Sequence, residues 1–145
     1  MSVTTNPAAE EALVEQLAQR LSVVLDEGHA DDVRVLDVRN LTVITDFMIV
    51  ASARSQRQAR ALVERVRDAA REAQSDILGV EGEQPGDWVL IDLSGVIVHI
   101  MQAETREFYQ LEKLWEQGPE ALARSQVDDA SSAPADSERE ADDGI

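Results

Sequence analysis

The feature of this sequence that most constrains its fold is a pair of apolar runs separated by only two residues. The runs are WVLIDL (residues 88–93) and VIVHIM (residues 96–101), and both are rich in β-branched and aliphatic side chains. A two-residue connection that contains glycine, as the Ser-Gly pair here does, is a strong hairpin signal. The sequence therefore predicts a β-hairpin in which Leu93 lies opposite Val96.

This register sorts the side chains of the hairpin onto two faces, because successive residues of a strand point to opposite sides of a sheet. One face is wholly aliphatic and is expected to lie in the core: Val89, Ile91, Leu93, Val96, Val98 and Ile100. The other face is mixed and pairs Trp88 with Met101, Leu90 with His99, and Asp92 with Ile97. Such a mixture is typical of protein interfaces. The alternative is that a helix covers this face, with His99 and Asp92 satisfied by hydrogen bonds.

Apolar residues at helical spacing predict three helices. The first is expected to begin at Pro7 after the cap Asn6 and to end near Gly28, with an apolar side made of Leu13, Leu17, Leu21 and Val24. The second follows the N-cap Ser55. The third begins at Thr105, and its expected packing residues are Phe108, Leu111, Leu114 and Trp115.

Further strands are predicted before the hairpin by short apolar or β-branched runs at residues 33–38, 47–52 and 76–82. The predicted order of elements is then α-β-β-α-β-β-β-α. This order indicates an α/β fold, a mixed five-stranded sheet with flanking helices.

Charge and composition limit the partners of the chain. The formal net charge is −16, which opposes binding to a phosphate backbone, so we expect little direct nucleic-acid binding and a basic protein partner. The chain has no cysteine, no signal-peptide pattern at its N-terminus and no apolar run long enough to cross a membrane, which predicts a cytoplasmic location. Residues 119–145 hold eight acidic residues, two arginines and no aromatic residue. We therefore expect an α/β domain at residues 1–118 and a disordered acidic tail at 119–145.

Catalytic patterns are missing from the sequence. Metal-dependent transferases on an α/β sheet place two carboxylates on one strand two residues apart, but Asp37 is followed at that spacing by Arg39, and Asp92 by Ser94. No phosphate-binding glycine-rich loop and no nucleophile elbow is present. We expect a binding protein without cofactor or metal. The alternative is a metal-dependent nucleotide-binding enzyme that uses Asp37, Asp46 and Asp92.

One basic feature lies on the second predicted helix, where four arginines share the sector opposite the apolar side: Arg57, Arg60, Arg67 and Arg71. Contact with RNA phosphates is one interpretation. Glu64 and Asp68 lie in the same sector, at spacings that pair Arg60 with Glu64 and Asp68 with Arg71. A solvated face of ion pairs is the favoured interpretation.

Four segments, in a fixed order, resemble a known family: VLDVRNLTVITDFMIVAS (residues 35–52), GVEGE (79–83), DWVLIDLSGVIVHIM (87–101) and ETREFYQLEKLW (104–115). They resemble the ribosomal silencing factor family, also called Iojap-like proteins (RsfS), and with the first helix the resemblance covers about residues 10–117. It implies a nucleotidyltransferase-like fold without nucleotidyltransferase activity. The chain departs from the family pattern with Ser-Gly in place of Gly-Asp at the hairpin tip and with Ala53 in place of a common glycine.

The resemblance also implies a function. Members of the family bind ribosomal protein number fourteen of the L series on the large ribosomal subunit, block joining of the subunits and lower translation when nutrients are scarce. Together with the mixed hairpin face, it leads us to expect a contact surface made of Trp88, Leu90, Asp92, Met101 and Tyr109, with weaker electrostatic contributions from Asp46 and Glu104. A homodimer that pairs this face with itself is a third alternative.

Overall fold

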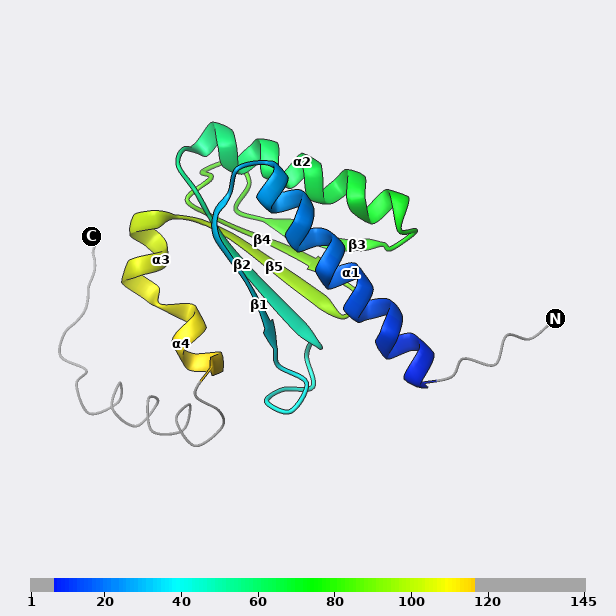
Figure 1. Ribbon diagram of the computed structural model, residues 1–145. Coiled ribbons are helices and arrows are strands. Elements are labelled where there is room, and N and C mark those ends of the chain that lie inside the picture. Colours follow the sequence, from blue (N-terminus) through cyan, green and yellow to red (C-terminus); the bar gives the residue numbers. More distant parts are fainter. Residues whose placement is uncertain (1–6, 117–145) are drawn as a thin grey trace, which may run out of the picture. The chain divides into compact units, whose positions relative to one another are not determined.

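The predicted hairpin forms in the computed structural model, which describes residues 7–116 (Figure 1). The elements are α1 (Pro7–Glu27), β1 (Asp31–Asp37), β2 (Phe47–Ala53), α2 (Gln56–Glu72), β3 (Ile77–Glu81), β4 (Trp88–Leu93), β5 (Val96–Gln102), α3 (Ala103–Tyr109) and α4 (Leu111–Glu116). The chain divides into two units after Gln110, so α4 is described by itself. The predicted acidic tail, residues 119–145, lies outside the described residues.

The strands form one five-stranded sheet in the order β1-β2-β5-β4-β3. β2 and β5 are parallel, and the other neighbouring pairs are antiparallel. The predicted fold class, a mixed five-stranded sheet with flanking helices, is therefore confirmed. The nucleotidyltransferase-like label stays a prediction from the resemblance.

The hairpin has the predicted register, from Trp88 opposite Met101 at its open end to Leu93 opposite Val96 at its turn. Gly95 in the turn has φ +86°, a conformation that glycine adopts without strain. A Cβ atom on Gly95 would lie 2.8 Å from Cγ1 of Val14 on α1. The turn therefore needs glycine both for its backbone angle and for its close packing on the first helix.

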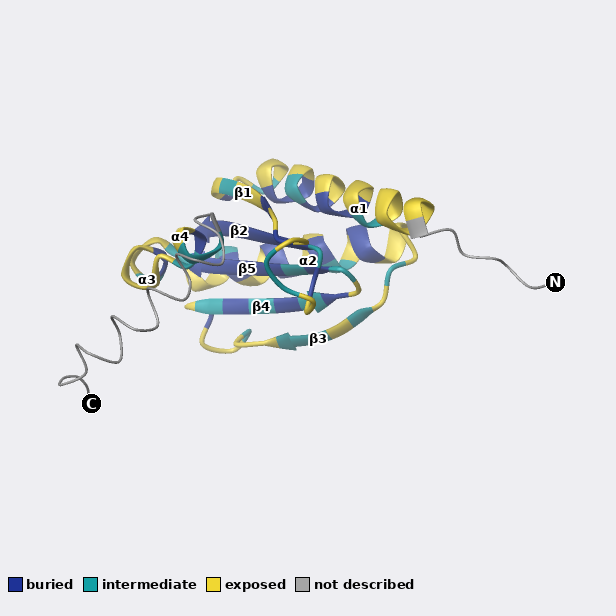
Figure 2. Cartoon of the chain, turned by 90° about the horizontal axis from the view of Figure 1, so that it is seen from below, coloured by how far each residue is buried: buried dark blue, intermediate teal, exposed yellow. Residues whose placement is uncertain are grey.

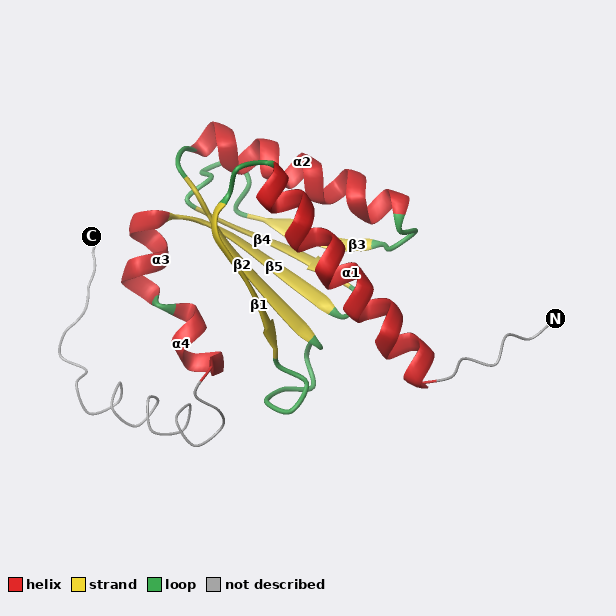
Figure 3. Cartoon of the chain, viewed as in Figure 1, coloured by secondary structure: helices red, strands yellow, loops and turns green. Residues whose placement is uncertain are grey.

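One face of the sheet is covered by α1 and α2, which contact each other (Figures 1 and 3). The predicted aliphatic face of the hairpin lies under them, and every one of its six side chains is buried. Small side chains on α2, among them Ala59, Ala69 and Ala70, let the helix approach the sheet closely. Figure 2 shows the buried positions concentrated along the central strands β2 and β5.

The start of α1 departs from the prediction for its apolar side. Leu17, Leu21 and Val24 are buried as expected, but Leu13 is exposed. Figure 1 shows the first turns of α1 extending past the end of the sheet, and 64% of the surface of Leu13 is exposed.

The final helix is not the single helix that the sequence predicts. Gln110 adopts the left-handed conformation with φ 49°, and its N–H donates to the carbonyl of Arg106 at 2.8 Å, which ends α3 at Tyr109. The helical spacing that placed Phe108 on one side with Leu111 and Trp115 therefore does not continue through this point. The prediction that Phe108 packs in the interior is wrong, since 79% of its surface is exposed.

Candidate partner-binding surface

Four rings form a continuous row from the interior to the surface, which we call the aromatic row: His99, Trp88, Tyr109 and Phe108. The ring centroids are 5.9 Å apart for His99 and Trp88, 4.9 Å for Trp88 and Tyr109, and 4.9 Å for Tyr109 and Phe108. All three pairs are tilted or edge-to-face, which are favourable arrangements of aromatic rings. Exposure rises along the row, from 5% for His99 through half-buried Trp88 to 54% for Tyr109 and 79% for Phe108.

The inner end of the row is fixed by a hydrogen bond between two side chains of the hairpin. Nε1–H of Trp88 donates to Nδ1 of His99 at 3.0 Å, so the neutral ring of His99 carries its proton on Nε2. Burial lowers the pKa of His99 to about 4, which keeps the ring neutral at physiological pH. In the part of the chain that the structure describes, Nε2 of His99 is buried and has no hydrogen-bond partner.

The outer end of the row is carried by α3, which is tied to the sheet through Arg106. This guanidinium is buried, donates to Oγ of Ser52 on β2 at 2.9 Å and lies 3.4 Å from Oδ2 of Asp32. α3 also contacts β5 (Figure 1). Arg106 therefore sets the place of α3, and with it the position of Tyr109 against Trp88.

The segment before β4 is tied to the end of β5 by Gln102. Its side-chain amide donates to the carbonyl of Gly86 at 3.1 Å and to Oδ1 of Asp87 at 3.2 Å, and its backbone N–H donates to the carbonyl of Asp87 at 3.0 Å. These bonds hold the backbone immediately before Trp88. The row is thus supported from β5, α3 and the 82–87 connection together.

The structure brings some of the predicted contact residues together and separates others. Trp88, Leu90 and Asp92 lie in a line on one face of β4, all half-buried, and Tyr109 joins them at the Trp88 end. Glu104 is exposed in the first turn of α3.

Two of the predicted residues do not contribute surface next to Trp88. Met101 has no exposed surface, so in this structure it supports the row from below instead of presenting a contact. Asp46 lies at the other end of the sheet, where its N–H donates to the carbonyl of Gly95 at 3.1 Å.

Sequence reasoning missed two members of the row. The sequence places His99 on the mixed face of the hairpin and leaves open whether it is covered, but it does not predict the ring contact with Trp88, although this diagonal relation follows from the hairpin register. Helical spacing predicts Phe108 in the core, but this spacing holds only if the helix continues through Gln110, where it ends. Adjacent aromatic residues close to a helix end were the only sequence signal for this pair.

The arginine face of α2 is largely neutralised. Arg67 pairs with Glu64 and with Glu83, and Arg71 pairs with Asp68 as the sequence predicts. The predicted pair of Arg60 with Glu64 is not formed, because Arg60 donates instead to the carbonyl of Gln84 at 2.6 Å and Arg67 takes Glu64. An ion-paired, solvated face is the interpretation that these contacts favour.

The carboxylates required by the enzyme alternative are not gathered. Within residues 7–116, no group of three or more His, Cys, Asp or Glu side chains is arranged to hold a metal ion. Asp37 is instead engaged by the Arg39 side chain, whose hydrogen bonds hold the pKa of that carboxyl below its usual range. Asp37, Asp46 and Asp92 therefore do not form the site that this alternative needs.

Most of the chain matches a known sequence family. The family described as "Ribosomal silencing factor during starvation" matches residues 10–144. The chain belongs to the ribosomal silencing factor family. The match runs beyond residue 117, where the resemblance noted in the sequence ended, and so includes most of the acidic tail.

Two curated proteins and a solved structure are also similar to this chain. The "Ribosomal silencing factor RsfS" of Haemophilus influenzae is 41% identical over 99 residues, which are 68% of this chain and 97% of that protein. The "Mitochondrial assembly of ribosomal large subunit protein 1" of Mus musculus is 33% identical over 95 residues, 63% of this chain and 42% of that protein. A crystal structure of a protein from Chromobacterium violaceum is similar with a TM-score of 0.69 and 36% identity, covering 71% of this chain and 86% of that one.

No helix among residues 7–116 of this ribosomal silencing factor homologue has the length and apolar character needed to cross a membrane.

Proposed function

We propose that this protein binds the large ribosomal subunit through ribosomal protein number fourteen of the L series, and that the aromatic row is the centre of the contact. Bound there, it occupies the surface at which the small subunit would dock, blocks joining of the subunits and represses translation under nutrient limitation. It acts in the cytoplasm, where the ribosomes are. It works by occupying a surface, not by catalysis.

The single observation that carries this proposal is the exposure of Phe108 and Tyr109 on a rigid base. Two large rings that stay mostly exposed are unfavourable in a free protein, and aromatic anchors of this kind dominate the binding energy of interfaces. Trp88 and His99 hold them from below through ring contacts and a hydrogen bond. A surface fixed in this way loses little conformational freedom on binding.

Charge supports a basic ribosomal protein as the partner. The net charge of −16 gives the chain a negative field, which speeds the approach of a positively charged surface. The family name supports a ribosomal partner, and the name of the mitochondrial relative supports the large ribosomal subunit. We therefore expect salt to slow association more than it accelerates dissociation.

The test is sedimentation of the purified full chain with large subunits, small subunits and joined ribosomes. Binding to the large particle alone, together with loss of joined ribosomes, is expected. Trp88→Ala should weaken this binding by at least about 1–2 kcal/mol. Because Trp88→Ala also removes packing, Tyr109→Ala serves as the second variant, and Val23→Ala, an exposed apolar position on α1, is the matched control.

Wild-type binding by both folded aromatic variants would contradict the assignment of the aromatic row. Equal binding to both subunits would contradict the proposed particle.

The homodimer alternative uses the same surface, since exposed Phe108 and Tyr109 side chains on two copies could pair with each other. Equilibrium sedimentation of the chain alone distinguishes the two cases. A dimer that dissociates in Tyr109→Ala and competes with large subunits is the pattern expected if both states use the aromatic row.

A further inference from the structure

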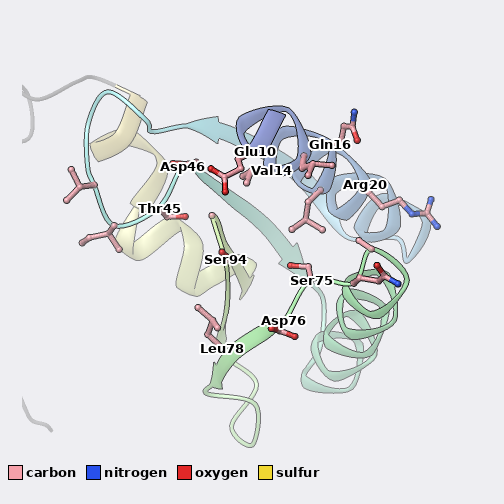
Figure 4. Close-up of a pocket in the computed structure, with 17 residues that line it drawn as sticks. Glu10, Val14, Gln16, Arg20, Thr45, Asp46, Ser75, Asp76, Leu78 and Ser94 are labelled. Carbon is pink, nitrogen blue, oxygen red and sulfur yellow. The ribbon is translucent and has the colours of Figure 1, made fainter. Parts of the chain in front are cut away.

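A second apolar surface lies at the other end of the sheet from the aromatic row. It is a hollow of about 1030 Å³ beside the hairpin turn, which we call the tip groove (Figure 4). Its walls come from α1, the 39–46 loop, the turn between α2 and β3, the start of β3, and Ser94 and Gly95. A strand rises about 3.4 Å per residue, so the hairpin turn lies about 20 Å from Trp88.

The groove gathers exposed apolar side chains. Leu13, Val43, Ile44 and Leu78 all line it, and all four are exposed, Ile44 by 79% and Leu78 by 65%. The aromatic row holds two further exposed large apolar residues, Phe108 and Tyr109. The two ends of the sheet therefore carry separate apolar patches, and such patches mark binding surfaces.

The loop that carries Val43 and Ile44 is held by hydrogen bonds within the loop and by one to the hairpin turn. The carbonyl of Val38 accepts hydrogen bonds from the N–H groups of Leu41 and Thr42, and the N–H of Asp46 donates to the carbonyl of Gly95. The N–H of Ile44 also donates to Oγ1 of Thr42 at 3.1 Å. The two apolar side chains are thus presented by a defined loop at the edge of the groove.

The charged side chains that line the groove are mostly acidic. Figure 4 shows Glu10 from α1, Asp46 from the loop and Asp76 from the segment before β3 around the hollow. Among the described residues that line the groove, Arg20 is the basic one. Its guanidinium lies 3.6 Å from the carboxylate of Glu72. The groove therefore combines exposed apolar side chains with a lining of net negative charge.

We propose that the tip groove binds a basic amphipathic helix of a second protein. An apolar stripe at helical spacing would contact Leu13, Ile44 and Leu78, and Lys or Arg residues flanking the stripe would face Glu10, Asp46 and Asp76. The negative lining opposes a nucleic acid. It also opposes the same groove of a second copy of this chain, because both would bring Glu10, Asp46 and Asp76 together.

The position of the groove gives this binding a consequence for function. The groove and the aromatic row lie at opposite ends of the hairpin, so a helix in the groove leaves the row free. The chain can then hold two partners at once. Binding in the groove does not depend on the function proposed for the aromatic row.

The test uses a synthetic helical peptide of about 15 residues with leucines at i, i+3, i+4 and i+7 flanked by lysines, and a matched peptide with glutamates in place of the lysines. Fluorescence anisotropy with the full chain measures both. The lysine peptide is expected to bind and the glutamate peptide to bind at least about tenfold more weakly, with a difference that shrinks as salt is added.

Variants locate the bound peptide. The double variant Ile44→Ser, Leu78→Ser removes apolar surface without changing charge and is expected to weaken binding at least about tenfold, whereas the control Val23→Ser on α1 retains it. Circular dichroism of the double variant and of Val23→Ser tests whether each variant folds. Phe108→Ala should bind the peptide like the wild type, which separates the groove from the aromatic row.

Failure of the lysine peptide to bind, equal binding of both peptides, or full binding by the double variant would overturn the proposal. A dimer of the chain alone that the double variant abolishes would also overturn it, because the occupant would then be a second copy.

Discussion

Nε1–H of Trp88 donates to Nδ1 of His99 at 3.0 Å across the β4–β5 hairpin. The two residues are diagonal neighbours, since Trp88 lies opposite Met101 and Leu90 lies opposite His99. Diagonal pairs are within reach of long aromatic side chains. The hydrogen bond therefore fixes the indole in one orientation against the sheet, with its other ring contact directed to Tyr109.

Removing the acceptor tests this positioning role of His99. In a Trp115→Phe background, where Trp88 is the single tryptophan, His99→Leu should speed exchange of the indole N–H with solvent at least about fivefold, which corresponds to about 1 kcal/mol of lost hydrogen bonding. His99→Gln offers an amide oxygen as a new acceptor and should restore part of the protection. Nuclear magnetic resonance measures the exchange directly. Unchanged exchange in His99→Leu would show that the bond does not hold the ring.

His99 also predicts how stability depends on pH. Burial lowers its pKa from 6.5 to about 4, so between these values the unfolded chain binds a proton that the folded chain does not. The stability that the folded chain has with His99 neutral is fully present above pH 6.5 and is lost progressively as pH falls toward 4. The free energy of unfolding from urea titrations should fall by up to about 1.4 kcal/mol per pH unit in this window from this group alone.

Two variants isolate this contribution. His99→Gln should flatten the slope between pH 6.5 and pH 5, where few carboxylates titrate. His29→Asn changes an exposed histidine with φ 68°, a conformation that asparagine tolerates, and is the control for the loss of a histidine side chain. An equal slope in His99→Gln and the wild type would exclude His99 as its source.

Substitution of Phe108 should affect binding to the large subunit without affecting folding. Because 79% of its surface is exposed, Phe108→Ala should change the free energy of unfolding by no more than about 0.5 kcal/mol. As part of the aromatic row it should nevertheless weaken binding to large ribosomal subunits by at least about 1 kcal/mol, roughly fivefold. Sedimentation against Val23→Ala measures the difference. Equal binding by the two variants would remove Phe108 from the contact.

The sequence predicts the hairpin well because local rules decide it. Alternation along residues 88–101 and a glycine turn fix both the register and the aliphatic face, and the structure follows both. The break at Gln110 is different, since a glutamine in the left-handed conformation has no turn signature in the sequence. Without that break, helical spacing assigns Phe108 to the interior.

Burial on the second face of the hairpin was also beyond local rules. Met101 and His99 alternate with core residues, and only the elements packed beyond the hairpin decide whether they are covered. The buried position of Arg106 arises in the same way, from its partner Ser52 on β2, which is far away in sequence. These long-range contacts build the base of the aromatic row, so sequence reasoning found Trp88 and Tyr109 but not the support beneath them.

Arg106 should be required for both stability and binding. Arg106→Met removes a buried guanidinium that bonds Ser52 and Asp32, and should lower the free energy of unfolding by about 1–3 kcal/mol. Because α3 loses this tie, binding to large subunits should weaken as well. Arg71→Met is the control, since its ion pair with Asp68 is solvent-exposed and should contribute less than about 1 kcal/mol. Urea denaturation of both variants measures the stability difference.

The hairpin turn gives the last prediction, a comparison of two glycines. Gly95→Ala places a methyl group 2.8 Å from Cγ1 of Val14 at a position with φ +86°, so both strain and overlap oppose it. The free energy of unfolding should fall by at least about 1–2 kcal/mol. Gly79→Ala meets no atom within 4 Å and has no positive φ, and should change stability little.

A double-mutant cycle separates the two causes at Gly95. Val14→Ala creates room for the added methyl group, so Gly95→Ala should cost less stability in that background than in the wild type. The part that remains is the backbone strain of φ +86°. If the cost is the same in both backgrounds, overlap with Val14 contributes nothing and the close packing of the turn on α1 is not what selects glycine. Because Val14 and Gly95 both line the tip groove, the same cycle measures how firmly its floor is packed.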